Sequence, residues 1–185
     1  MFPLFRKELI SHTTNQNAKC EEKNAMTISK GDRLPDVKFG TMTADGPTQL
    51  STSDVFGGKT VALFAVPGAF TPTCSAKHLP GFVEKADELR AKGVDQIACV
   101  SVNDVFVMNA WGKDQGVGSD VLMLADGNGD FAEATGLTMD GSGFGMGLRS
   151  QRFSMLVKDG VVEILNTEEP GDFRTSSAEH MLSQL

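Results

Sequence analysis

Three short, continuously apolar runs, each followed by a helix-like segment, constrain the fold more than any other feature. The runs are TVALFAV at 60–66, QIACVSV at 96–102 and VLMLAD at 121–126. A run without polar alternation is typical of a strand buried on both faces, and strands that alternate with helices form a parallel sheet. The sequence therefore predicts an α/β fold whose central sheet is covered by helices on both faces.

Shorter strand patterns on either side indicate that the sheet is mixed rather than wholly parallel. Two pairs of runs carry turn residues between them, and Asp159-Gly160 is a strong hairpin signal. The pairs are VKFGTM (37–42) with TQLST (48–52), and RFSMLV (152–157) with VVEILN (161–166). Helices are predicted at 73–92, 104–112, 130–136 and 176–185. Pro80 lies inside the first helix and, because it has no N–H, should kink it.

Length and charge limit what the chain does. Its 185 residues suit one domain, which we place at 29–185 behind a flexible extension at 1–28. The formal net charge of −7 disfavours binding to nucleic acid or to anionic membranes. No apolar run approaches the ~20 residues that cross a bilayer. We expect a cytoplasmic protein. A mitochondrial location is the alternative, although the extension holds one Arg and three Glu, unlike an Arg-rich, acid-poor transit peptide.

The three cysteines do not form a disulfide scaffold, so each thiol needs its own explanation. Their odd number and wide spacing indicate a reducing compartment, and Cys20, in the extension, is treated as incidental. Cys74 opens the first predicted helix, where free backbone N–H groups and the helix dipole stabilise a thiolate. The preceding turn, PGAFTPT, should hold further N–H groups around the sulfur. A reactive thiolate is therefore predicted, with a buried core thiol as the alternative.

The stretch around Cys74 is similar to the active-site motif of a known family. Pro67, Thr71 and Cys74 form P-x-x-x-T-x-x-C, which resembles the motif of peroxiredoxins. The longer PGAFTPTCSAKHLPGF resembles the peroxiredoxin-5 or plant type II subfamily, and the resemblance continues through GVDQIACVSVNDVFVMNAW and RSQRFSMLVKDG to the final SQL. It implies a thioredoxin-like fold and a thiol-dependent peroxidase that serves antioxidant defence.

The resemblance also implies roles for four residues. Cys74 matches the peroxidatic nucleophile, and Thr71 matches the residue whose hydroxyl bonds the thiolate and the peroxide oxygen. Pro67 matches the residue that shields the pocket from water, and Arg152 matches the arginine that completes the site. Arg149 lies three residues earlier, and without the resemblance the sequence does not choose between the two arginines.

The chemistry agrees with those roles. A thiolate displaces one peroxide oxygen from the other, and hydrogen-bond donors stabilise the negative charge that develops on the leaving oxygen. The substrate would be hydrogen peroxide or an alkyl hydroperoxide, and the product at Cys74 a sulfenic acid that another thiol must reduce. No metal, haem or flavin cofactor is expected.

The source of that second thiol is an open point. Cys99 lies mid-strand, and type II members that resemble this chain carry a cysteine there, so it is a candidate second redox cysteine; a buried core thiol is the alternative. A disulfide with Cys74 would require local unfolding. The C-terminal GDFRTSSAE lacks the resolving cysteine of many peroxiredoxin-5 members. We expect glutathione with glutaredoxin, or thioredoxin, as the reductant, and the resemblance implies a homodimer.

Other signals are weaker. Gly68, Phe70 and His78 are candidates for the substrate pocket, although His78 is alternatively a helix-surface residue. DGNGD (126–130) lacks the Gly and closing Glu of a calcium loop, and GSGFGMG (141–147), a predicted flexible loop, lacks the Lys of a phosphate loop. We therefore expect no metal site.

The sequence leaves two alternative functions. A redox sensor or holdase would use the same cysteine as a peroxidase, so reaction rate rather than sequence separates the two. A thiol–disulfide oxidoreductase needs C-x-x-C, and Thr71 stands where its first cysteine would be.

Overall fold

The structure is a computed structural model that describes residues 27–185. Most of the predicted extension, including Cys20, lies outside the described residues. The packed domain begins slightly earlier than expected, because Ile28 is buried and its N–H donates to the carbonyl of Thr135. No helix within residues 27–185 has the length and apolar character needed to cross a membrane.

A mixed sheet of seven strands forms the centre of the molecule, in the order β2-β1-β5-β4-β3-β8-β9. The three long apolar runs form β3, β4 and β5, which pair in parallel, whereas the flanking strands pair antiparallel. The predicted mixed sheet is therefore confirmed. The strands are β1 (Lys38–Thr43), β2 (Gly46–Ser51), β3 (Thr60–Ala65), β4 (Gln96–Ser101), β5 (Leu122–Ala125), β8 (Phe153–Lys158) and β9 (Val161–Thr167).

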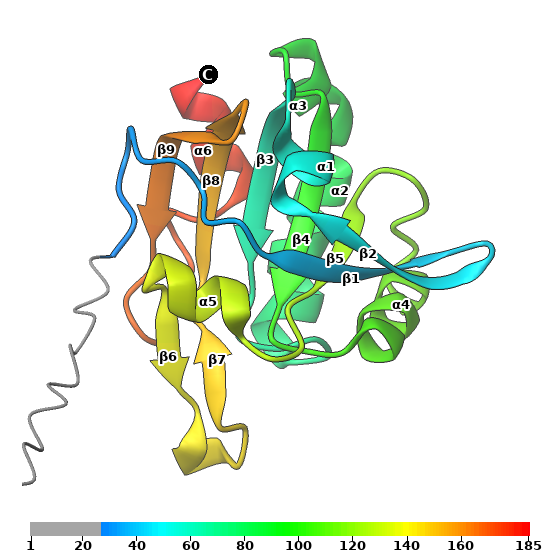
Figure 1. The fold of residues 1–185 in the computed structure, drawn as a ribbon. Helices are drawn as coiled ribbons and strands as arrows, with labels where there is room; N and C mark the ends of the chain where they lie inside the picture. Colours follow the sequence, from blue (N-terminus) through cyan, green and yellow to red (C-terminus); the bar gives the residue numbers. More distant parts are fainter. Residues whose placement is uncertain (1–26) are drawn as a thin grey trace, which may run out of the picture.

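Helices cover both faces of this sheet, as predicted. They are α1 (Thr52–Phe56), η1 (Cys74–His78), α2 (Leu79–Glu84), α3 (Ala86–Ala91), α4 (Val105–Asp114), α5 (Asp130–Thr135) and α6 (Ala178–Gln184). One hydrophobic cluster packs α2, α3, α4 and α6 against one face of the sheet, and a second packs α1 and α5 against the other. In Figure 1, α1 and α5 lie on the near side of the sheet and α2 on the far side.

The loop predicted at 141–147 is the tip of a hairpin. The short strands β6 (Thr138–Asp140) and β7 (Leu148–Ser150) pair antiparallel and flank the 3-10 turn η2 (Ser142–Phe144). Figure 1 shows this hairpin projecting from the same end of the sheet to which β3 and β4 point. That end carries the carboxyl termini of the parallel strands, where ligand sites of α/β folds gather.

The helix predicted at 73–92 is divided into η1, α2 and α3. In η1 the N–H of Leu79 bonds to the carbonyl of Cys74, five residues back, which makes this a π turn. The π turn comes directly before Pro80, and a second interruption lies at Lys85. The irregularity expected from Pro80 thus takes the form of a π turn beside the cysteine, at a place where such turns often accompany function.

Candidate active site

Cys74 lies just beyond the end of β3, in the first turn of the helical segment that follows. The N–H of Ser75 donates to the Thr71 carbonyl at 3.0 Å, which closes that turn. The indole N–H of Trp111 on α4 donates to the Ser75 hydroxyl at 2.9 Å and ties the turn to the core. Cys74 itself is fully buried. The thiol is thus held at a fixed place rather than on a mobile loop.

Two side chains donate to the sulfur of Cys74. The Thr71 hydroxyl lies 2.8 Å from Sγ, and Nη1 of Arg152 lies 3.5 Å from it. The sequence predicted that backbone N–H groups of the PGAFTPT turn would also surround the sulfur. Within residues 27–185, the hydrogen bonds to Sγ come instead from these two side chains. One cation and one hydroxyl facing a sulfur are the groups that stabilise a thiolate and a charged leaving oxygen.

The loop between β3 and Cys74 is held by a polar cluster from two other elements. The Asn103 side-chain oxygen accepts from the N–H of Ala69 at 3.0 Å and from Nη2 of Arg149 at 3.0 Å. Nε of Arg149 donates to the Pro67 carbonyl at 2.6 Å. The Ser101 hydroxyl lies 2.8 Å from the same Asn103 oxygen. Arg149 therefore holds the loop backbone, whereas Arg152 contacts the sulfur.

Tight packing explains the glycine in this loop. A Cβ at Gly68 would lie 3.1 Å from both Nη2 of Arg149 and Cγ2 of Thr71. Phe70 adopts a left-handed backbone with φ of 61°, which is uncommon for a bulky residue, and its side chain is 53% exposed. Gly68 thus lies inside the site, whereas the Phe70 ring faces outward at its edge.

His78 lies behind Arg152 and is completely buried, unlike a helix-surface residue. Its Nδ1 lies 3.1 Å from Nη1 of Arg152, and its Nε2 lies 3.0 Å from the carbonyl of Ser176. Burial, followed by the positive charge of Arg152, lowers the pKa of His78 to about 3. The imidazole is therefore neutral near pH 7, with Nε2–H donating to Ser176 and Nδ1 accepting from Arg152.

The segment 168–176, between β9 and α6, closes over these two side chains. A carboxylate oxygen of Glu168 accepts from the N–H of Arg174 at 2.6 Å, the N–H of Ser176 at 2.7 Å and the Ser176 hydroxyl at 2.9 Å. The Phe173 ring packs 5.0 Å from the His78 ring and 5.8 Å from the Arg152 guanidinium carbon. Glu168 thus fixes the segment that touches His78 and Arg152.

Cys99 lies in β4, fully buried in the same hydrophobic cluster as Cys74. It is paired with Phe64 of β3 on one side and with Met123 of β5 on the other. Burial, with a smaller contribution from the charge of Cys74, raises the pKa of the Cys99 thiol well above its ordinary value. The fold therefore holds Cys99 as a protonated core thiol between two strands.

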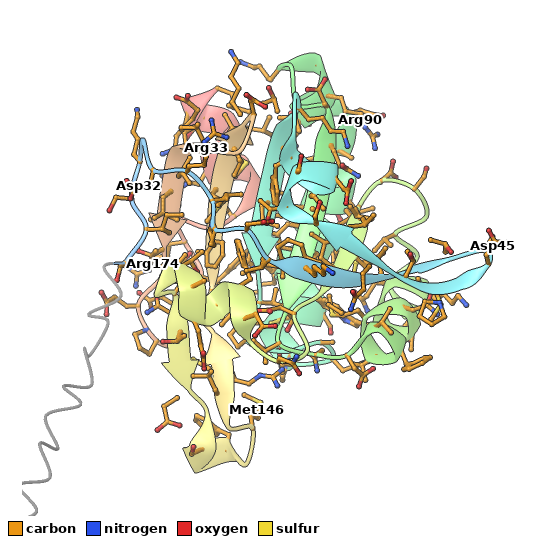
Figure 2. All side chains as sticks on the ribbon, in the orientation of Figure 1. Asp32, Arg33, Asp45, Arg90, Met146 and Arg174 are labelled. Atoms are coloured by element: carbon orange, nitrogen blue, oxygen red, sulfur yellow. The ribbon has the colours of Figure 1, made fainter. Side chains whose placement is uncertain are left out.

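A cavity of about 980 Å³ opens elsewhere, and its lining includes Arg90, Gly112 and Asp120 but not Cys74. Figure 2 shows Arg90 at the end of the molecule opposite Met146 of the projecting hairpin. This cavity has no part in the thiol site. Within residues 27–185, no three side chains of His, Cys, Asp or Glu group as metal ligands do.

Sequence reasoning missed Asn103, Glu168 and Ser176, and assigned no role to Arg149. Asn103 had a recognisable signal, because a polar residue directly after a buried parallel strand lies at the edge where sites form. Glu168 and Ser176 had none, since they belong to an irregular segment that only the folded chain brings against Arg152.

Comparison with known proteins agrees with this geometry. Residues 29–182 match the Redoxin family model. The chain is 56% identical over 164 residues to Peroxiredoxin-2E-2, chloroplastic, of Oryza sativa subsp. japonica, an alignment that covers 86% of this chain and 73% of that protein. It is 49% identical over 162 residues to Peroxiredoxin-2B of Arabidopsis thaliana, covering 85% and 98%.

Solved structures give the same result. Reduced Prx3 of Vibrio vulnificus in complex with H2O2 matches with a TM-score of 0.82 at 52% identity, covering 85% of this chain and 99% of that one. Peroxiredoxin 5 of Alvinella pompejana matches with a TM-score of 0.75 at 34% identity, covering 84% and 96%. The chain therefore belongs to the peroxiredoxin family, in its type II and peroxiredoxin-5 group, and is a thiol-dependent peroxidase with a thioredoxin-like fold.

Proposed function

We propose that Cys74 is the peroxidatic nucleophile and that it reduces hydrogen peroxide and alkyl hydroperoxides. The observation that carries this proposal is the pair of donors on Sγ, the Thr71 hydroxyl at 2.8 Å and Nη1 of Arg152 at 3.5 Å. The same two groups can stabilise the negative charge first on the sulfur and then on the leaving oxygen, because both lie beside the reacting atom.

In the first step, the Cys74 thiolate attacks the nearer peroxide oxygen. A sulfur–oxygen bond forms, the oxygen–oxygen bond breaks, and the leaving oxygen departs with the electron pair and takes up a proton to become water or an alcohol. Sulfur is oxidised to the sulfenic acid by two electrons, and the peroxide is reduced by two. Arg152 and Thr71 stabilise the leaving oxygen, while Pro67 and Gly68 border the site and keep water from it.

We propose that an external thiol completes the cycle. One thiol condenses with the sulfenic acid to give a mixed disulfide and water, and a second thiol displaces Cys74 from it. Glutathione with glutaredoxin, or thioredoxin, would supply both. The burial of Cys99 in a central strand supports this over an internal disulfide. In this scheme sulfur itself carries the electrons, so no metal, haem or flavin takes part.

Peroxide consumption with each reductant tests the proposal on wild type, Cys74→Ser and Cys99→Ser. Loss of turnover in Cys74→Ser with both reductants is the expected result. Peroxidase activity that survives in this variant would refute the role of Cys74. Loss of turnover in Cys99→Ser with both reductants would instead overturn external resolution. A Cys74 that peroxide oxidises but that neither reductant recycles would favour the redox sensor.

We propose further that the protein is a homodimer joined near the active-site end. Within residues 27–185, four large apolar residues are exposed: Phe70 (53%), Phe106 (64%), Phe144 (84%) and Leu148 (41%). The substitution Phe106→Glu should convert dimer to monomer in sedimentation, without unfolding, because an acidic residue suits the first turn of α4. Gln49→Glu, on the exposed edge strand β2, is the matched control. An unchanged dimer in Phe106→Glu would refute this interface.

We propose that the protein is located in the cytoplasm. The relative Peroxiredoxin-2E-2 is named chloroplastic, which makes import into an organelle the competing expectation. Fluorescent fusions of the full chain and of residues 27–185 separate the two. Organellar signal that depends on residues 1–26 would refute a cytoplasmic location.

A further inference from the structure

We propose that His78 is a positioning residue that orients Arg152 toward the sulfur of Cys74. One nitrogen of Arg152, Nη1, lies 3.5 Å from Sγ and 3.1 Å from Nδ1 of His78. On the other side of the ring, Nε2 of His78 lies 3.0 Å from the Ser176 carbonyl. The inference deepens the function proposed above, because it rests on the role of Arg152 in the peroxide reaction.

The hydrogens on these nitrogens explain why the arrangement orients Arg152. Nη1 of an arginine carries two hydrogens and cannot accept a hydrogen bond. If one points to Sγ, the other must find an acceptor, and Nδ1 of His78 is the acceptor within reach. The Ser176 carbonyl can only accept, so it holds the proton of His78 on Nε2 and leaves Nδ1 free to accept. The tautomer of His78 is therefore set by the backbone.

Packing prevents the ring from turning away. The centroid of the His78 ring lies 4.9 Å from that of Phe64, 5.7 Å from that of Phe82 and 5.0 Å from that of Phe173. A buried ring surrounded by other rings has little freedom to change rotamer. The guanidinium of Arg152 also lies over the Phe173 face, 5.8 Å from its centroid. The position of the arginine thus depends on the helix that carries Cys74 and on the C-terminal segment.

Two substitutions separate the acceptor of His78 from its donor. In His78→Asn the amide oxygen can take roughly the place of Nδ1 and accept from Arg152, but the donor to Ser176 is lost. In His78→Gln the amide nitrogen can take roughly the place of Nε2 and donate to Ser176, but the acceptor for Arg152 is lost. Both residues are polar and close in size to histidine, so each keeps the buried site filled.

The first measurement is the second-order rate constant for sulfenic acid formation with hydrogen peroxide. Trp111, the single tryptophan, reports it in stopped-flow fluorescence because its indole contacts the residue after Cys74. We expect this rate constant to fall about 10-fold in His78→Gln, because misplacing a catalytic group costs one to two orders of magnitude in rate. In His78→Asn, which keeps the acceptor for Arg152, it should fall less, about 3-fold. The thermal unfolding midpoints of the two variants should not follow the order of their rate constants. A rate for His78→Gln equal to or above that of His78→Asn would overturn the proposal.

The second measurement repeats the pair in an Arg152→Ala background. If His78 acts through Arg152, the difference between the two His78 variants should vanish there, because no guanidinium remains to be oriented. A difference that persists overturns the positioning role while leaving Arg152 itself intact. A wild-type rate in Arg152→Ala alone would refute the role proposed for Arg152, and the inference about His78 with it.

Discussion

The Thr71 hydroxyl faces two acceptors, Cys74 Sγ at 2.8 Å and the Gly68 carbonyl at 2.9 Å. A hydroxyl has one hydrogen, so it donates to one of them at a time. When Cys74 is a thiolate, the charged sulfur is the stronger acceptor. When Cys74 is a thiol, the hydroxyl can turn to Gly68 and accept from the S–H instead. Thr71 therefore adapts to either state of the sulfur without moving its side chain.

The first prediction concerns that hydroxyl. Thr71→Val keeps the shape of the side chain but removes the donor, and a hydrogen bond to a charged group is worth about 1.5–3 kcal/mol. The rate constant for peroxide should fall about 10- to 100-fold, whereas Thr71→Ser, which keeps the hydroxyl, should stay closer to wild type. Stopped-flow fluorescence measures both. Equal rates for the valine and serine variants would show that the hydroxyl has no part in the reaction.

The second prediction concerns Cys99. Its thiol is fully buried between two strands and its pKa is raised, so neither alkylation nor disulfide formation should occur in the folded protein. Iodoacetamide should leave Cys99 unmodified, as read by peptide mass, until urea unfolds the domain. After one equivalent of peroxide, the mass of the Cys74 peptide should rise by one oxygen. A mass that fits a 74–99 disulfide would contradict the prediction.

The third prediction concerns Asn103, whose side-chain oxygen accepts from the N–H of Ala69 and from Arg149. Asn103→Ala leaves both half-buried donors without this partner, and an unsatisfied group costs up to about 1–3 kcal/mol when it is buried. The free energy of unfolding and the peroxide rate should both fall. Asn109→Ala on α4 is the control, because within residues 27–185 the Asn109 side chain makes no hydrogen bond. A loss in Asn109→Ala as large as in Asn103→Ala would contradict the prediction.

The fourth prediction concerns pH and Glu168. Burial alone would raise the pKa of Glu168, but hydrogen bonds from the N–H groups of Ser176 and Arg174 and from the Ser176 hydroxyl leave it below its ordinary value of 4.5. A carboxyl whose pKa is lower in the folded state stabilises the fold above its unfolded pKa, and this contribution is lost as pH falls through the folded pKa. The stabilising contribution is therefore complete above pH 4.5.

Thermal unfolding midpoints of wild type and Glu168→Gln test this. The wild type should be the more stable at pH 6 to 7, and the difference should shrink as the pH falls below 4.5. Glu169→Gln, at the exposed neighbouring position, serves as the control. A difference that is constant over this range would show that ionisation of Glu168 does not hold the 168–176 segment.

Several parts of the fold were predictable because buried strands have a characteristic pattern of apolar residues. The runs at 60–66, 96–102 and 121–126 are apolar without alternation, as strands covered on both faces must be, and they form β3, β4 and β5. The short helix α1 and the strands β6 and β7 were missed. They span five and three residues, too few for a period to emerge.

Some residues of the candidate site were likewise predictable from the sequence, and others were not. Thr71 and Cys74 are three residues apart in one turn, so local backbone geometry brings the hydroxyl to the sulfur, as the resemblance to peroxiredoxins implied. The residues 1–26 and the predictions made for them lie outside the described structure.

Without the resemblance to peroxiredoxins, the choice between Arg149 and Arg152 was beyond the sequence, because both lie near the start of the same predicted strand. Tertiary structure decides it through register: Phe153 of β8 pairs with Ala65 at the end of β3, which places Arg152 beside the loop that leads to Cys74. Arg152 reaches the sulfur across 78 positions, and His78 reaches Ser176 across 98. The sequence by itself thus determined that Cys74 begins a helical segment, and the turn that holds Cys74 also holds Thr71, which donates to its sulfur. Only the pairing of distant strands and the packing of the C-terminal segment decided which arginine faces the sulfur and which histidine lies behind it.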